Sequence, residues 1–166
     1  AARVQSLMGE AGLDGIMLTH NADLFYLSGV VQQGQVYVPL ERAPLLMVRK
    51  QAQRAWLNSA LGTDNIKDVR SLRQLPALIT SNGNTPRRIG FTFDTLPVAL
   101  FNAYAKALAE LGAELVDASL VMRQARSLKS AYEVQQIRHA ARVADAGLQA
   151  ARAHLREGVT EVEVAA

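Results

Sequence analysis

The last quarter of the chain carries its most regular pattern, a run in which apolar residues alternate steps of three and four. Side chains with this spacing lie on one face of an α-helix, so the pattern predicts a long helix over residues 131–157. The stripe consists of Val134, Ile137, Ala141, Ala144, Leu148, Ala151 and Leu155. Such a helix would be about 40 Å long at ~1.5 Å per residue. Residues 158–166 are too few to bury a stripe of this length.

Capping signals mark the ends of this helix. Ser130 and Glu133 have the spacing of a capping box, in which each side chain accepts a hydrogen bond from the other residue's backbone N–H. Gly158 suits the left-handed conformation that often ends a helix. Thr160 and Glu163 form a second capping box, which opens a helix that the chain does not complete. We therefore expect the chain to stop at the start of a truncated second domain.

Residues 1–126 instead alternate short apolar runs with amphipathic segments. Strands are expected over 14–19, 35–40, 43–48, 66–69, 88–93 and 114–117, and helices over 3–11, 51–60, 72–79, 97–111 and 119–126. This alternation predicts an α/β domain with a mixed, mostly parallel sheet flanked by helices. The second and third strands are joined by a short segment and predict one antiparallel hairpin. We place this domain at 1–126 and the start of the truncated one at 127–166.

Three local expectations follow from residue type. Residues 20–23 have the composition of a turn, and Asp23 would cap the turn that holds residues 25–27. Pro39 has no backbone N–H to donate, so it predicts an edge position for its strand. Trp56 and Leu57 are large and apolar, so we expect them on the buried side of their helix.

Two groups of residues resemble motifs of the creatinase/prolidase family, which includes the pita-bread metallopeptidases that cleave Xaa-Pro bonds. The front motif, Asp23–Gly29, is similar to the family's [ND]-x-x-Y-L-[TS]-G-F, and Val30 departs from it where the family usually has an aromatic residue. The second group resembles the family's junction between its two domains. It consists of Arg123, Arg126, Lys129, Ser130, Glu133, Ile137, Ala140, Ala141, Gly158, Val159, Thr160, Glu161 and Glu163.

This resemblance implies a ribonuclease H-like N-terminal domain followed by a pita-bread catalytic domain. The parent protein would be a metal-dependent Xaa-Pro dipeptidase or aminopeptidase, a hydrolase whose two divalent ions (Mn, Co or Zn) are held by two Asp, one His and two Glu of the absent half. This chain alone would hold no cofactor and would be inactive. Its expected partners are its own C-terminal catalytic domain, a second copy in a homodimer, and short proline-containing peptides.

The expected role of the domain is to support dimerisation and to shape access to the active site. The alternative is an interaction module of a catalytically degenerate or creatinase-like relative. Carried over from the family, the loop over 30–34 lies at the edge of the substrate, where Gln32 and Gln33 would contact it. The opposing interpretation is a loop that only connects strands. His20 is open to the same choice between substrate contact and turn residue.

The basic residues of the junction are open to two interpretations. Arg123, Arg126 and Lys129 recur every three residues, and Glu133 follows in the capping box. The first interpretation is that the three cations hold the two domains together by pairing with carboxylates of the catalytic half. The second is a basic, solvated linker.

Several other functions are not supported by the sequence. The chain has no cysteine, which excludes thiol chemistry and disulfides, and we expect a cytoplasmic protein. His139 and His154 are too far apart on one helix to share a metal ion. P-loop, G-x-G-x-x-G, H-E-x-x-H and G-x-S-x-G motifs are absent. The net charge is only +3 and aromatic residues are few, so we expect no nucleic acid partner. No apolar run approaches the ~20 residues that cross a bilayer, so we expect no membrane association.

Overall fold

A computed structural model describes residues 1–50 and 52–165. Its contacts divide the chain into two compact units, Ala1–Arg126 and Ser127–Ala166. Gln51, the first residue of one expected helix, and Ala166 lie outside the described residues. No helix in the described ranges combines the length and the apolar character needed to cross a membrane.

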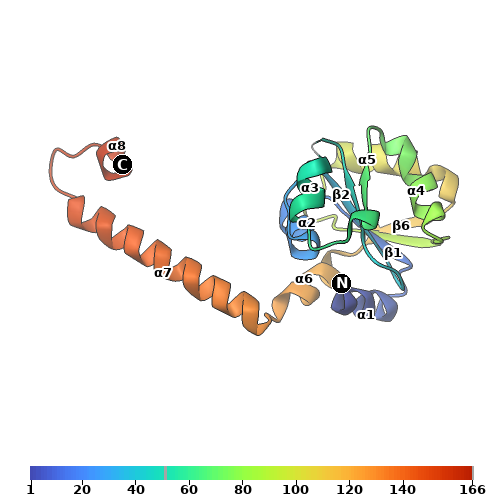
Figure 1. Cartoon of the computed structure of the whole chain (residues 1–166), viewed down its shortest axis with the longest axis horizontal. Coiled ribbons are helices and arrows are strands. Elements are labelled where there is room, and N and C mark those ends of the chain that lie inside the picture. The colour runs from blue at the N-terminus through green and yellow to red at the C-terminus, as the bar shows by residue number, and fades with distance from the viewer. Residues whose placement is uncertain (51, 166) are drawn as a thin grey trace. The chain divides into compact units, whose positions relative to one another are not determined.

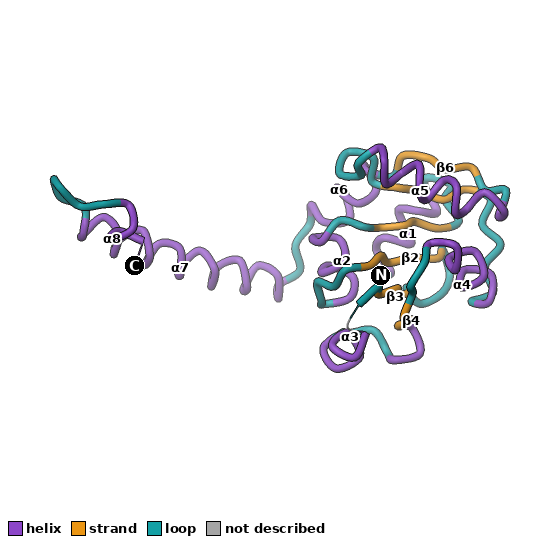
Figure 2. Tube along the Cα trace, turned by 90° about the horizontal axis from the view of Figure 1, so that it is seen from above, coloured by secondary structure: helices purple, strands orange, loops and turns teal. Residues whose placement is uncertain are grey.

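The first unit is built on a six-stranded sheet with the order β4-β3-β2-β1-β5-β6. Its strands are β1 (Gly15–Leu18), β2 (Gly34–Pro39), β3 (Leu45–Val48), β4 (Ile66–Asp68), β5 (Arg88–Phe91) and β6 (Glu114–Asp117). β2 runs antiparallel to both β1 and β3, and the other three pairings are parallel. This confirms the predicted mixed, mostly parallel sheet, although with two antiparallel pairs where one was expected. Figure 2 shows the strands succeeding one another from β6 to β4.

Helices cover both faces of this sheet (Figure 1). They are α1 (Ala2–Glu10), α2 (Asn21–Ser28), α3 (Ala52–Asn58), α4 (Leu75–Ser81), α5 (Val98–Leu108) and α6 (Ser119–Ser127). One face packs against apolar residues of α1, α2, α3 and α6. The opposite face packs against α4 and α5. Strand β1 contributes to both clusters because all four of its residues are buried and their side chains alternate between the faces.

Three local predictions are wrong. Residues 20–23 do not form a turn, because α2 begins at Asn21 and buries Leu24. Pro39 does not mark an edge, because β2 lies inside the sheet. The proline is tolerated because the pairing of β2 with β3 ends at Tyr37, and the neighbouring Leu40 donates to Asp14 on the β1 side. Trp56 and Leu57 are 44% and 84% exposed. The small residues Ala52 and Ala55 make the buried side of α3 instead, since they allow the helix to approach the sheet closely.

The second unit contains α7 (Ala131–His154) and α8 (Glu161–Ala165). The capping box of Ser130 and Glu133 is present at the start of α7. The backbone N–H groups of Thr160 and Glu163 are likewise paired with each other's side chains ahead of α8. No residue of α7 is buried, and most of the apolar stripe identified in the sequence is exposed. The helix ends at His154, three residues before the predicted end at 157.

Candidate functional site

The front motif forms helix α2 and the turn that follows it. Gly29 ends the helix with a φ of 74°, a left-handed conformation that glycine adopts without strain, and its N–H donates to the carbonyl of Phe25 at 2.8 Å. The buried hydroxyl of Ser28 donates to the carbonyl of Leu24 at 2.7 Å and accepts from the N–H of Val30 at 3.3 Å. These bonds fix the direction in which the chain leaves the helix.

The loop after Gly29 enters strand β2 at a tightly packed position. A Cβ at Gly34 would collide with the backbone carbonyl of Met47, so glycine is required where the loop meets β3. Val30 is 7% exposed and belongs to the apolar core, so it does not reach a surface as the family resemblance implied. Gln33 is held through its backbone carbonyl, which accepts from the N–H of Arg49 at 2.8 Å.

Gln32 and Gln33 line an open cavity of about 310 Å³, together with Val31 and the basic residues Lys50 and Arg54. The lining therefore combines two residues with amide side chains, two basic residues and one exposed apolar residue. Such a lining suits a ligand that carries a carboxylate next to a small apolar group. His20 does not line this cavity. Lys50 and Arg54 were not predicted, because they lie in a different segment of the sequence and only the β2–β3 pairing brings them to the loop.

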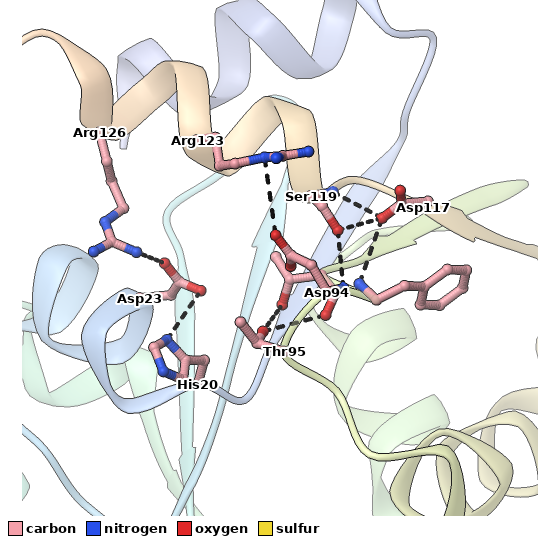
Figure 3. Close-up of polar contacts among 10 residues, drawn as sticks. His20, Asp23, Asp94, Thr95, Asp117, Ser119, Arg123 and Arg126 are labelled. Carbon is pink, nitrogen blue, oxygen red and sulfur yellow. Dashed lines mark hydrogen bonds and ion pairs between the residues drawn. The ribbon is translucent and has the colours of Figure 1, made fainter.

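Asp23 lies at the centre of a second polar group (Figure 3). Its carboxylate is 3% exposed and accepts a 3.0 Å hydrogen bond from the guanidinium of Arg126. His20 precedes α2, and its ring nitrogen lies 3.9 Å from the other carboxylate oxygen. Burial raises the pKa of Asp23 above its usual value, and the charges of Arg126 and His20 offset only part of this increase.

A third polar group connects the ends of β5 and β6 to the start of α6 (Figure 3). Asp117 accepts hydrogen bonds from the backbone N–H of Ser119, at 2.9 Å, and from the Ser119 hydroxyl. The same hydroxyl accepts from the N–H of Asp94 at 3.2 Å. Asp94 in turn lies 3.9 Å from Arg123. The Ser119 hydroxyl lowers the pKa of Asp117, with further contributions from two backbone N–H groups and Arg123.

The structure thus places the four predicted junction residues in two settings. Arg126 and Arg123 each have a carboxylate partner within the first unit, Asp23 and Asp94. Lys129 donates to the carbonyl of Ser127 at 3.4 Å, and Glu133 completes the capping box of α7. The pairing of these cations with carboxylates of a catalytic half stays a prediction. Neither Asp23 nor Asp94 was identified from the sequence as a partner.

The described residues do not fit a metal centre. Within residues 1–50 and 52–165 no group of three or more His, Cys, Asp or Glu side chains is arranged to hold an ion. We therefore assign no metal-dependent step to side chains of this chain.

Comparison with known proteins identifies relatives that cover between 75% and 98% of the chain. It is 23% identical over 164 residues to the uncharacterized peptidase YqhT of Bacillus subtilis (strain 168), covering 98% of this chain and 45% of that protein. The structure matches an Xaa-Pro dipeptidase from Bacillus anthracis with a TM-score of 0.80 and 25% identity, over 98% of this chain and 44% of that one. It also matches the N-terminal domain of the cytoplasmic peptidase PepQ from Mycobacterium tuberculosis H37Rv, with a TM-score of 0.65 and 24% identity, over 75% of this chain and 96% of that domain.

The matches cover nearly all or most of this chain but only part of the curated relatives. The chain spans a little under half the length of the curated relatives that it matches. The profile of the creatinase/prolidase N-terminal domain matches residues 1–128, which includes the whole six-stranded sheet and the helices around it. The chain therefore belongs to the creatinase/prolidase N-terminal domain family.

Proposed function

We propose that this chain is the non-catalytic N-terminal domain of a metal-dependent Xaa-Pro dipeptidase or aminopeptidase. The observation that carries the proposal is the family match over residues 1–128, in a chain that covers 41–47% of its curated relatives. Solved structures with this fold include an Xaa-Pro dipeptidase and prolidases. Residues 127–166 would then begin the catalytic domain, and the exposed stripe of α7 would pack inside it. The parent protein would act in the cytoplasm.

Within the parent enzyme, the domain would support a homodimer and narrow the entrance to the active site. The cavity beside Gln32 and Gln33 supports this role, because its amides and the cations Lys50 and Arg54 can bind the carboxylate of a short proline-containing peptide. Exposed Val31 offers the proline ring an apolar contact. Cleavage itself would occur in the catalytic half, whose ligand set would hold two divalent ions (Mn, Co or Zn) that could supply an activated water.

The junction residues would have a supporting role. Arg126 holds α6 on the first unit through Asp23, whereas Arg123 only lies 3.9 Å from the exposed Asp94. Glu133 fixes the start of α7. Lys129 lies between Arg126 and Glu133 in the sequence, and its ammonium would reach carboxylates of the catalytic half. His20 would act through Asp23 and not through the substrate. The alternative of an interaction module is not favoured, since the relatives described above are peptidases by name.

The test has a genetic arm and an enzymatic arm. The coding sequence should continue beyond Ala166 with an ordered Asp, Asp, His, Glu, Glu ligand set. The purified full-length protein should then hydrolyse Ala-Pro, lose activity with a chelator and regain it with Mn²⁺. The 166-residue chain should be inactive under the same conditions. A downstream sequence without those ligands would contradict the proposal, as would metal-dependent cleavage by the isolated chain.

A further inference from the structure

Asp23 and Arg126 belong to the two separate motifs of the chain and are 103 residues apart in sequence. They meet because α2 and α6 pack on the same face of the sheet. The exposures of the two side chains are very different, 3% for Asp23 and 43% for Arg126. The surrounding core therefore fixes the position of the Asp23 carboxylate. The half-exposed guanidinium of Arg126, near the end of α6, is restrained by its hydrogen bond to that carboxylate.

The energetics of the pair argue against a role in stability alone. Burial raises the pKa of Asp23, and this effect exceeds the opposing effects of Arg126 and His20; Asp94 adds a small increase. Ionised Asp23 is therefore less favourable in the folded protein than in water, even with its partner present. A buried charge that does not stabilise the fold still determines geometry, because a carboxylate and a guanidinium interact only in a narrow range of positions.

A second bond connects the same two helices. The hydroxyl of Tyr26 on α2 donates to the carbonyl of Ala125 on α6 at 3.2 Å. On its other side, α2 leads through Ser28 and Gly29 into the loop that carries Gln32 and Gln33. Helix α2, which has eight residues, thus contacts the last turn of α6 and also leads into the candidate substrate loop.

We propose that Asp23 is a positioning residue which, by holding Arg126, fixes the carboxyl end of α6 relative to the Gln32–Gln33 loop. The inference rests on the proposed function, in which the catalytic half follows α6 directly. The end of α6 would then determine how the Gln32–Gln33 loop is placed relative to the active site of the catalytic half. Because geometric errors of ~1 Å far from the reacting atoms cost up to ~100-fold in rate, the pair would affect catalysis without touching substrate.

The test compares Asp23→Asn with Asp94→Asn in the full-length protein. Both substitutions remove a carboxylate facing an arginine of α6, but Asp94 is 42% exposed and lies 3.9 Å from Arg123. We expect Asp23→Asn to lower kcat/KM for Ala-Pro about 10-fold with an unchanged unfolding midpoint. Hydrogen exchange over residues 123–130 should also accelerate about 10-fold. Asp94→Asn should stay within about twofold of wild type in both measurements.

A double-mutant cycle separates positioning from a general defect. If Asp23 acts through Arg126, adding Asp23→Asn to Arg126→Gln should lower kcat/KM no further than Arg126→Gln does alone. Arg126→Gln changes a half-exposed side chain but leaves the buried Asp23 carboxylate without this partner, so its unfolding midpoint is measured alongside kcat/KM. If Asp23→Asn does not fold, a kcat/KM within twofold of wild type for folded Arg126→Gln would overturn the positioning role.

The two proposals fail in different ways. A wild-type protein that cleaves no Xaa-Pro peptide would overturn the proposed function, while hydrogen exchange would still decide whether Asp23 holds α6. Values of kcat/KM and exchange within twofold of wild type for Asp23→Asn would overturn the positioning role. Independent, multiplicative effects of the two substitutions would overturn it as well.

Discussion

The hydroxyl of Tyr104 on α5 donates a 3.2 Å hydrogen bond to the side-chain Oε1 of Gln35 on β2, and both residues are buried. Gln35 is one of the few polar side chains in the core of the first unit. Burial also raises the pKa of Tyr104 to about 12, so its hydroxyl remains a donor throughout the physiological range. This bond connects the sheet to the helix layer formed by α4 and α5.

Tyr104→Phe should therefore destabilise the fold by about 1–3 kcal/mol, because it leaves a buried amide oxygen unpaired. Chemical denaturation monitored by circular dichroism measures this change. The matched control is the double variant Gln35→Met with Tyr104→Phe, which removes both polar groups and should recover most of the loss. A double variant that is less stable than Tyr104→Phe would contradict this account of the bond.

Ser119→Ala should weaken the fold in a pH-dependent manner. The pKa of Asp117 lies below its ordinary value of 3.8, chiefly because the Ser119 hydroxyl donates to its carboxylate. A carboxyl whose folded-state pKa is depressed stabilises the fold above its unfolded pKa, and this stabilisation is lost as the pH falls through the folded value. Unfolding midpoints of wild type and variant should therefore differ more at pH 7 than at a pH well below the ordinary pKa of 3.8. Asp117→Asn, which cannot ionise, serves as the control and should show the same convergence; a difference that is independent of pH would exclude the carboxylate.

Leu27→Ala and Leu57→Ala remove the same atoms from two different environments. Leu27 is 8% exposed and belongs to the core, whereas Leu57 is 84% exposed on α3. The first substitution should cost about 2–5 kcal/mol of unfolding free energy, and the second no more than about 0.5 kcal/mol. Equal effects in denaturant titrations would mean that one of these two assignments is mistaken.

The periodicity and the capping signals predicted most of the fold. The α7 capping box could be predicted because it depends on residues three positions apart. The α2 helix was missed because Asn21 and Asp23 are typical of turns, although Leu24 and Leu27 have helical spacing and their burial determines the outcome. On α3, residue size was misleading, since close packing against the sheet favours Ala55 over Trp56.

The candidate site was less predictable than the fold. The resemblance pointed to Gln32 and Gln33, but the cations beside them come from a neighbouring strand connection and required the sheet topology. The partnership of Asp23 with Arg126 spans 103 residues. No local sequence pattern predicts such a contact, because it arises only when α2 and α6 pack on the same face of the sheet.

The central claim is that the Gln32–Gln33 loop forms the edge of a peptidase active site. The most direct test is kcat/KM for Ala-Pro in the full-length protein carrying Gln32→Ala and Gln33→Ala. Loss of one or two substrate hydrogen bonds worth about 1 kcal/mol each should lower kcat/KM about 5-fold to 30-fold. The unfolding free energy should change by no more than about 0.5 kcal/mol, because neither glutamine is buried. A kcat/KM within twofold of wild type would show that the loop only connects strands.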